Sequence, residues 1–155
     1  MKTNAARILD QLGFPYRTLH YEVPQEDLNA IDVAERVGLP PEQVFKTLVV
    51  RGDRTGVMLA VIPGSTELSF KKLAALSGDK KIELVPLKEV QPLTGYVRGG
   101  VSPLGTKKRY PVFIDEICLA WESISVSGGM KGVQLLVSPE HLIAATSART
   151  GDLTL

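Results

Sequence analysis

Apolar residues recur along this chain in two patterns. In the first pattern they recur every three to four residues, as on one face of a helix. Ala5, Ile8 and Leu9 fall on one face of a helix over residues 4–12, and Gly13 is suited to end it. Asn29 and Ser69 are suitable capping residues for two further helices. Ser138 followed by a proline is a favourable start for the last one. Helices are therefore predicted over residues 4–12, 30–37, 70–76, 87–92 and 140–145.

The second pattern consists of short apolar runs that are bounded by turn residues, as in β-strands. Residues 45–51 and 56–62 form a predicted hairpin around the polar tetrapeptide 52–55. Strands are predicted over residues 16–22, 45–51, 56–62, 82–85, 112–114, 124–126 and 134–137. Strands and short helices mix without strict alternation, which predicts an α+β fold with a mainly antiparallel or mixed sheet. No repeat or linker interrupts the 155 residues, so we expect a single domain over 1–155.

The charge is nearly balanced overall, at +1, but it is unevenly distributed. Residues 69–109 carry nine Lys and Arg against three Asp and Glu, whereas the flanking segments are net negative. This pattern predicts a local anion-binding face rather than a general coat for nucleic acid, although a solvated lysine-rich helix face would look the same. No apolar run reaches the ~18 residues of a membrane span, and residues 1–12 lack the apolar core of a signal peptide. We therefore expect a cytoplasmic protein without membrane association.

Residue types that commonly carry catalysis are scarce. The single cysteine, Cys118, lies among apolar residues and is expected to pack in the core. His20 and His141 are too far apart to suggest a metal cluster, so neither a metal nor another cofactor is expected. No Gly-x-Ser-x-Gly elbow and no credible Ser/His/Asp set is present. The sequence thus predicts a reaction without a conventional protein nucleophile.

Lys46 interrupts an apolar strand in the run Val44-Phe45-Lys46-Thr47-Leu48. Removing an ammonium from water costs several kcal/mol unless an anion or hydrogen-bond acceptors meet it. The lysine could reach the surface by strand alternation, or it could pair with a buried carboxylate. The functional interpretation is a cation at the floor of a pocket, placed for a phosphate or a developing negative oxygen.

Two glycine-containing segments also indicate a binding site. Gly99-Gly100-Val101-Ser102-Pro103-Leu104-Gly105 precedes the basic triplet Lys107-Lys108-Arg109, and glycines let a backbone approach a ligand closely. Val126-Ser127-Gly128-Gly129 ends a predicted strand. Each segment could instead be an ordinary surface turn. Neither is a nucleotide-hydrolase phosphate loop, because Gly-x-x-x-x-Gly-Lys-Ser/Thr is absent.

Taken together and in order, these segments resemble the YbaK family of tRNA-editing deacylases, whose fold is shared by the editing domain of bacterial prolyl-tRNA synthetases. The resemblance spans roughly residues 5–144 and includes His20-Tyr21-Glu22, Phe45-Lys46-Thr47, Thr94-Gly95-Tyr96 and the glycine segments above. It implies a curved mixed or antiparallel sheet flanked by short helices, with a pocket for the aminoacylated 3′ end of tRNA.

The resemblance also implies roles for individual residues. The catalytic set would be Lys46, Gly99 and Gly100. The substrate-binding set would be Tyr21, Thr47, Ser102, Pro103, Ser127, Gly128, Gly129 and Gln134. Phosphates of the tRNA would meet Arg98, Lys107, Lys108, Arg109, Lys71 and Lys72. Two positions depart from some family members: Gln134 replaces an acidic residue and Asn29 replaces an aromatic one, which leaves amino-acid specificity more open than the activity.

The expected function is a trans-acting aminoacyl-tRNA deacylase that clears mischarged tRNA(Pro), with Cys-tRNA(Pro) as the first candidate. Such editing exists because a proline-sized site discriminates poorly against cysteine and alanine. The resemblance implies that the substrate's own thiol attacks its ester and leaves as a thiolactone. Alternatives are an Ala-tRNA(Pro) deacylase, a non-catalytic tRNA-binding module that docks on a synthetase, and an unrelated small-molecule enzyme. Aminoacylated tRNA(Pro), and prolyl-tRNA synthetase as a delivering protein, are the expected partners.

Overall fold

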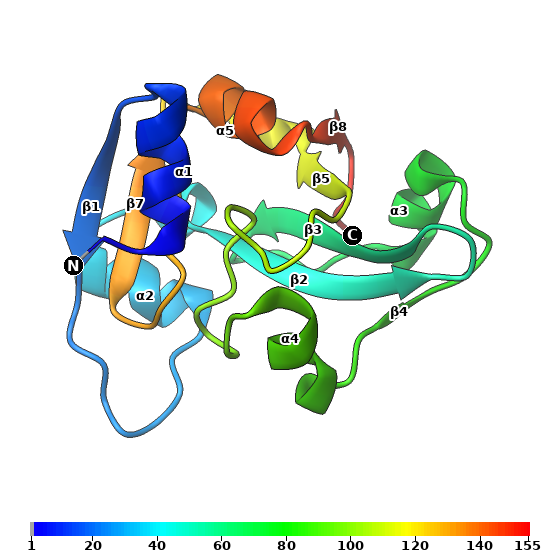
Figure 1. The fold of residues 1–155 in the computed structure, drawn as a ribbon, viewed down its shortest axis with the longest axis horizontal. Coiled ribbons are helices and arrows are strands. Elements are labelled where there is room, and N and C mark those ends of the chain that lie inside the picture. The colour runs from blue at the N-terminus through cyan, green and yellow to red at the C-terminus, as the bar shows by residue number, and fades with distance from the viewer. Residues whose placement is uncertain (1) are drawn as a thin grey trace.

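The computed structural model describes residues 2–155, which form five α-helices, two 3-10 helices and eight strands (Figure 1). The α-helices are α1 (Asn4–Leu12), α2 (Ala30–Val37), α3 (Phe70–Ser77), α4 (Leu87–Thr94) and α5 (Pro139–Thr146). The strands are β1 (Tyr16–His20), β2 (Phe45–Gly52), β3 (Gly56–Pro63), β4 (Ile82–Leu84), β5 (Val112–Asp115), β6 (Ile124–Ser127), β7 (Val133–Val137) and β8 (Arg149–Gly151). The 3-10 helices are η1 (Pro41–Gln43) and η2 (Glu116–Ala120).

The strands form two sheets. The larger has the order β4-β2-β3-β5-β8, in which β2 pairs antiparallel with β3 and β4, whereas β5 pairs parallel with β3 and β8. The smaller is antiparallel, in the order β1-β7-β6. A parallel bridge between Val44 and Ser125 connects β6 to the beginning of β2. This arrangement confirms the predicted α+β class with mixed and antiparallel pairing.

The helices begin and end where local chemistry predicts. The side chain of Asn29 accepts the N–H of Asp32, whose own carboxylate accepts the N–H of Asn29, so a complete capping box starts α2. Ser69 caps α3 with a single bond, in which its side chain accepts the N–H of Lys72. Ser138 stands at the N-cap of α5 but makes no side-chain capping bond, so Pro139 alone marks that start.

The prediction of residues 134–137 as the last strand is wrong, because β8 follows α5. The segment Arg149–Gly151 has no apolar alternation and joins the sheet by parallel pairing with β5. The 3-10 helix η2 was likewise not predicted. No helix in residues 2–155 combines the length and apolarity needed to cross a bilayer.

Strand β3 lies at the centre of the core and is covered on both faces. Leu59 and Val61 point into one apolar cluster, with α1, α5 and the smaller sheet. Met58, Ala60 and Ile62 point into a second cluster, with α3 and the last residues of the described chain. Since side chains alternate along a strand, a continuous apolar run is what a strand buried on both faces requires.

Strand β2 is less completely paired than β3. Along one edge it pairs with β3 throughout, but along the other β4 covers only residues 50–52. Val44 accepts the N–H of Gly64 on the β3 side, and Val49 accepts the N–H of Val85 on the β4 side. Backbone groups of successive residues face alternate edges, so those of Thr47 face the edge that β4 leaves uncovered. This gap positions the candidate site.

Candidate functional site

A cleft of about 710 Å³ opens along the uncovered edge of β2. This volume lies within the range of small-ligand sites. Its walls come from residues 21–30, from β2 itself, from residues 84–90 and 98–101, and from the β6–β7 hairpin. Seven of the sequence-predicted residues line it: Tyr21, Lys46, Thr47, Arg98, Gly99, Ser127 and Gln134.

Lys46 is half-buried in this cleft instead of extending into bulk solvent. Its Nζ donates a hydrogen bond to the carbonyl oxygen of Gly64, at 3.2 Å. Burial lowers the pKa of Lys46, and the charge of Glu67 acts in the opposite direction. An ammonium has three N–H donors, so two remain after the bond to Gly64 for a ligand in the cleft.

Thr47 presents a buried hydroxyl that no residue of the described chain satisfies. Its Oγ1 is inaccessible to solvent and has no hydrogen-bond partner within residues 2–155. A buried polar group without a partner costs about 1–3 kcal/mol, so its presence in a cleft wall requires an explanation. Rotation of the Thr47 side chain would expose this hydroxyl and let it bond to a ligand atom in the cleft.

Gln134 and Ser127 face each other across the β6–β7 pair and are both buried. The Oε1 of Gln134 accepts a hydrogen bond from the hydroxyl of Ser125 at 2.6 Å, which leaves the amide nitrogen to donate to the cleft. The Oγ of Ser127 accepts the N–H of Gly129 at 3.1 Å, so its proton remains available as a donor. The side chain of Gln134 therefore gives this part of the cleft wall a neutral donor.

The two glycines after Ser127 were predicted to line the substrate-binding site, but the structure places them outside it. Neither Gly128 nor Gly129 is among the residues that line the cleft. A Cβ on Gly128 would lie 2.6 Å from a methyl of Val133, and one on Gly129 would lie 3.0 Å from the ring of Tyr96. Gly128 is therefore needed for close packing within the hairpin, and Gly129 for packing of the hairpin against Tyr96.

Only part of the Gly99–Pro103 segment reaches the cleft. Gly99 lines it with φ of +85°, a conformation that favours glycine, and Val101 lines it as well. Gly100 is buried, and its N–H donates to the carbonyl of Val97 at 2.9 Å. Ser102 is fully buried, with its Oγ accepting the N–H of Leu104. Pro103 lines a separate cavity of about 330 Å³ beneath α1 and α5.

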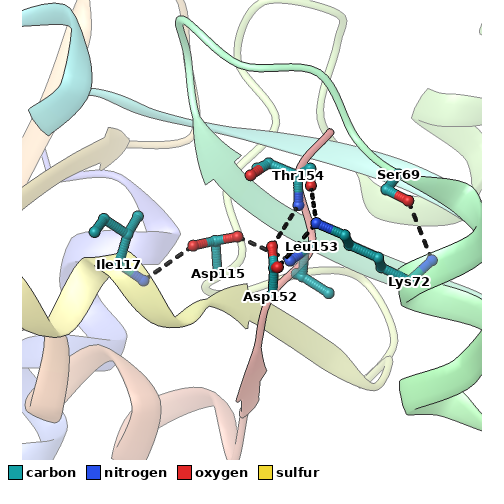
Figure 2. A network of polar contacts seen from close by, with 7 residues as sticks. All are labelled: Ser69, Lys72, Asp115, Ile117, Asp152, Leu153 and Thr154. Carbon is teal, nitrogen blue, oxygen red and sulfur yellow. Dashed lines mark hydrogen bonds and ion pairs between the residues drawn. The ribbon is translucent and has the colours of Figure 1, made fainter.

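The predicted phosphate-binding residues do not form one cluster. Lys71 and Lys72 belong to α3, which lies at the opposite end of the larger sheet from α2 in Figure 1. The Nζ of Lys72 donates to Asp152 at 2.8 Å and to the carbonyl of Thr154 at 2.6 Å (Figure 2). Lys107 and Lys108 are exposed on the loop after the glycine segment. Arg109 donates to Ser147 and lines the smaller cavity.

The cleft also contains charged residues that sequence reasoning missed. Glu26, Asp27 and Lys131 line it beside Arg98, and Lys131 forms an ion pair with Asp27 at 3.1 Å. Lys131 follows the Ser-Gly-Gly segment by only two residues, which is the one signal that could have indicated it. Asp27 and Glu26 lie in a polar segment without any motif.

The protein's own thiol is placed away from this chemistry. Cys118 is fully buried in the core, where burial, with the nearby charge of Asp115, raises the pKa of its thiol to about 11. No histidine or cysteine is among the residues lining the cleft. Among residues 2–155, no group of three or more His, Cys, Asp or Glu is arranged to hold a metal ion.

Comparison with known proteins shows the family to which this chain belongs. The model of the family described as "Aminoacyl-tRNA editing domain" matches residues 27–145. A relative from Enterococcus faecalis, named "Putative Cys-tRNA(Pro)/Cys-tRNA(Cys) deacylase EbsC", is 41% identical over 99% of this chain and 93% of its own. A proline–tRNA ligase of Thermotoga neapolitana is 33% identical over 55% of this chain, which corresponds to 15% of the ligase.

Solved structures show the same similarity across the whole chain. A structure titled "Crystal structure of a putative trans-editing enzyme for prolyl tRNA synthetase" superposes with a TM-score of 0.85 and 28% identity, covering 100% of this chain and 99% of that one. A hypothetical protein of known structure gives a TM-score of 0.89 and 28% identity, covering 99% and 100%. With a family match over most of its length and a full-length relative above 40% identity, this chain belongs to the aminoacyl-tRNA editing domain family.

Proposed function

We propose that this protein is a trans-acting aminoacyl-tRNA deacylase that removes cysteine wrongly attached to tRNA(Pro). Family membership and the name of the full-length Enterococcus relative support this substrate. The observation that carries the proposal is the half-buried Lys46, which faces a cleft whose wall also holds the unsatisfied hydroxyl of Thr47. A tRNA substrate would place this activity in the cytoplasm.

The cleft can stabilise the negative oxygen that develops when an ester carbonyl is attacked. Lys46 retains two N–H donors, and the backbone of Gly99 and Val101 lies in the facing wall. Donors fixed in advance around a developing oxyanion are commonly the largest contribution to acyl-transfer catalysis. Tyr21, Thr47, Ser127 and Gln134 would then hold the amino acid and the terminal ribose.

The attacking group would come from the substrate. The cysteine sulfur forms a bond to its own carbonyl carbon, the bond to the ribose oxygen breaks, and the thiol proton ends on that oxygen. The products are a cyclic thiolactone and free tRNA. Well-oriented intramolecular attack can reach effective concentrations on the order of 10⁵–10⁸ M, so a pocket that folds the substrate would add to the charge stabilisation by Lys46 and offset part of the strain of the four-membered ring. Attack by water instead would make the enzyme a hydrolase.

The test is deacylation of purified Cys-tRNA(Pro) by Lys46→Met, which keeps the aliphatic stem and removes the charge. We expect kcat to fall about 10²- to 10³-fold, as for the loss of one oxyanion donor. An unchanged rate would remove Lys46 from the mechanism. The exposed lysine variant Lys80→Met, at the far end of the larger sheet, is the matched control.

A panel of tRNA(Pro) charged with Cys, Ala, Ser or Pro separates the remaining possibilities. A thiol mechanism predicts that Cys-tRNA(Pro) reacts much faster than Ser-tRNA(Pro), which differs by one atom. Equal rates on these two substrates indicate attack by water. Preference for Ala-tRNA(Pro) would replace cysteine as the substrate, and binding without cleavage of any member would support a tRNA-binding module.

Prolyl-tRNA synthetase is the proposed partner that delivers the substrate. The net charge of +1 and the dispersal of the basic residues predict weak binding of the tRNA body. Deacylation in the presence of the synthetase should therefore be faster at limiting tRNA. The same rate with and without the synthetase would contradict a delivering role.

A further inference from the structure

Three loops meet at one end of the cleft through charged side chains. Asp27 belongs to the loop between β1 and α2, Arg98 to the loop after α4, and Lys131 to the β6–β7 hairpin. The Nζ of Lys131 lies 3.1 Å from the Oδ1 of Asp27. The hydrogen bond from Lys131 lowers the pKa of Asp27, and the charge of Arg98, which lines the same cleft without forming an ion pair with Asp27, adds a smaller effect.

The stem of Lys131 is held by packing even though its charge is exposed. A Cβ on Gly99 would lie 3.0 Å from the Cε of Lys131, which shows that the lysine stem rests on the glycine backbone. A Cβ on Gly100 would similarly lie 3.1 Å from the backbone of Met130. The ammonium of Lys131 is therefore positioned beside the loop that forms the facing wall of the cleft.

The ion pair between Lys131 and Asp27 is weak enough to be exchanged. The two side chains are 40% and 67% exposed, and such surface pairs contribute at most about 1 kcal/mol. Glu26 lines the same end, so two carboxylates offset the two cations and leave this end without net charge. A phosphodiester offers one oxygen to Lys131 and another to Arg98, so a single ligand can form charge-assisted bonds to both cations.

We propose that Lys131 and Arg98 bind the phosphodiester that precedes the terminal adenosine of the tRNA. Without tRNA, Lys131 forms an ion pair with Asp27, and the phosphodiester replaces Asp27 when the tRNA binds. This inference rests on the proposed function. With the ester held at Lys46 and Thr47, the first negative charge back along the strand belongs to this phosphodiester. Of the six residues predicted to bind tRNA phosphates, only Arg98 lines the cleft, and Lys131 is a further cation that lines it.

The experiment compares two substrates that differ in this phosphate: Cys-tRNA(Pro), and cysteine esterified to adenosine without any phosphate. The variant is Lys131→Met, which keeps the stem on Gly99, and the control is Lys80→Met. We expect KM for Cys-tRNA(Pro) to rise about fivefold, with kcat unchanged, because one exposed charge contact is lost. The adenosine ester should be cleaved by Lys131→Met as by the wild type.

Salt dependence gives a second measure that uses tRNA alone. Each phosphate contact to a single strand contributes about 0.7 to the slope of log affinity against log salt concentration. Lys131→Met should reduce that slope by this amount, Lys131→Arg should restore it, and Lys80→Met should leave it unchanged. Asp27→Asn should lower KM for Cys-tRNA(Pro) about two- to threefold and leave the adenosine ester unaffected, because Lys131 no longer has a competing carboxylate.

The outcomes distinguish the two proposals. If the wild type cleaves neither substrate, the proposed function fails and this inference with it. If it cleaves Cys-tRNA(Pro) but Lys131→Met loses the same factor on both substrates, or keeps the full salt slope, Lys131 only supports the loop. Weaker tRNA use by Asp27→Asn would likewise overturn the exchange, while the deacylase function would stand.

Discussion

Gly64 shows how a single backbone position supports the side chain of Lys46. A Cβ at this position would lie 2.2 Å from the Cβ of Ala30 and 2.9 Å from the carbonyl oxygen of Val44. The lack of a side chain thus lets the Gly64 carbonyl accept the bond from Lys46. The same close approach brings α2, which begins at Ala30, against the end of β3.

Gly64→Ala should therefore reduce both stability and activity. The added methyl forces α2 and the turn apart, which should cost roughly 1–3 kcal/mol and move the acceptor of Lys46. Urea denaturation and deacylation of Cys-tRNA(Pro) measure the two effects. Adding Ala30→Gly removes the atom that is struck first and should recover part of both losses. A fully stable, fully active Gly64→Ala would contradict this account.

Cys118 should be unreactive as long as the protein is folded. Its thiol is fully buried, and burial raises its pKa to about 11, so the reactive thiolate is rare at pH 8. A thiol reagent such as Ellman's reagent should label it only at the rate of unfolding, and fast labelling of the native protein would contradict this placement. Cys118→Ala should keep kcat on Cys-tRNA(Pro) unchanged while lowering the midpoint of urea denaturation.

At the residue scale, the sequence indicated charged groups whose burial costs free energy, but it did not indicate exposed charges that form weak ion pairs. Lys46 was conspicuous because an ammonium in an apolar strand requires compensation. Lys131 and Asp27 are ordinary exposed charges, and only folding brings them together over a separation of 104 positions in the sequence. Ser102 had the right chemistry for a ligand contact, but a glycine-rich segment does not specify which of its side chains turn inward.

The β2–β3 hairpin is fastened at its turn by the carboxylate of Asp79, from the segment after α3. One oxygen accepts the N–H groups of Arg54 and Thr55, both at 2.7 Å, and the other accepts the hydroxyl of Ser77. Burial alone would raise the pKa of Asp79, but these hydrogen bonds hold it well below its usual range. The charged form of this side chain thus stabilises the fold.

The contribution of Asp79 should depend on pH in a defined direction. An unfolded aspartate has a pKa near 3.9, so a lowered folded pKa stabilises the protein fully above about pH 5, and the benefit declines as pH falls below about 4. Asp79→Asn should cost roughly 1–3 kcal/mol at pH 7. The difference from the wild type in urea denaturation should shrink at pH 3. A difference that is constant from pH 7 to pH 3 would contradict the role of the charge.

At the element scale, prediction succeeded where local chemistry decides. The helix over residues 4–12 was predicted to its exact bounds, because its apolar residues recur at helical spacing and Gly13 marks its end. The hairpin was predicted from its polar tetrapeptide, and its strands pair as expected. β8 was not predicted, because its three residues join the sheet through backbone hydrogen bonds to β5. Such bonds do not require a particular pattern of apolar and polar residues in the sequence.

At the scale of the whole molecule, the cleft exists because one edge of β2 pairs with different strands at its two ends. The edge of β2 faces β4 near Gly52 and β6 near Val44, with Thr47 between them. Neither sheet covers this interval, so polar groups from loops far apart in sequence converge there. The parallel pairings of β5 with β3 and β8, which complete the larger sheet, join segments that no local spacing relates.

Residues 149–155 run between β5 and α3 (Figure 2). This segment makes one buried contact and one exposed contact with its neighbours. The buried carboxylate of Asp115 accepts the N–H groups of Ile117 and Leu153, both at 2.9 Å. The side chain of Leu153 is fully buried in the core cluster against α3. Lys72 binds the neighbouring Asp152 at the surface.

The two contacts should differ sharply in their contribution to stability. Leu153→Ala removes buried methyl groups and leaves a cavity, which should cost about 2–5 kcal/mol. Lys72→Met breaks only the exposed ion pair and the bond to Thr154, and should cost about 1 kcal/mol or less. Urea denaturation of both variants measures the difference. Because Leu153 is not among the residues that line the cleft, Leu153→Ala should keep its kcat on Cys-tRNA(Pro) under conditions where it remains folded. Equal losses of stability would contradict the larger contribution of the buried leucine.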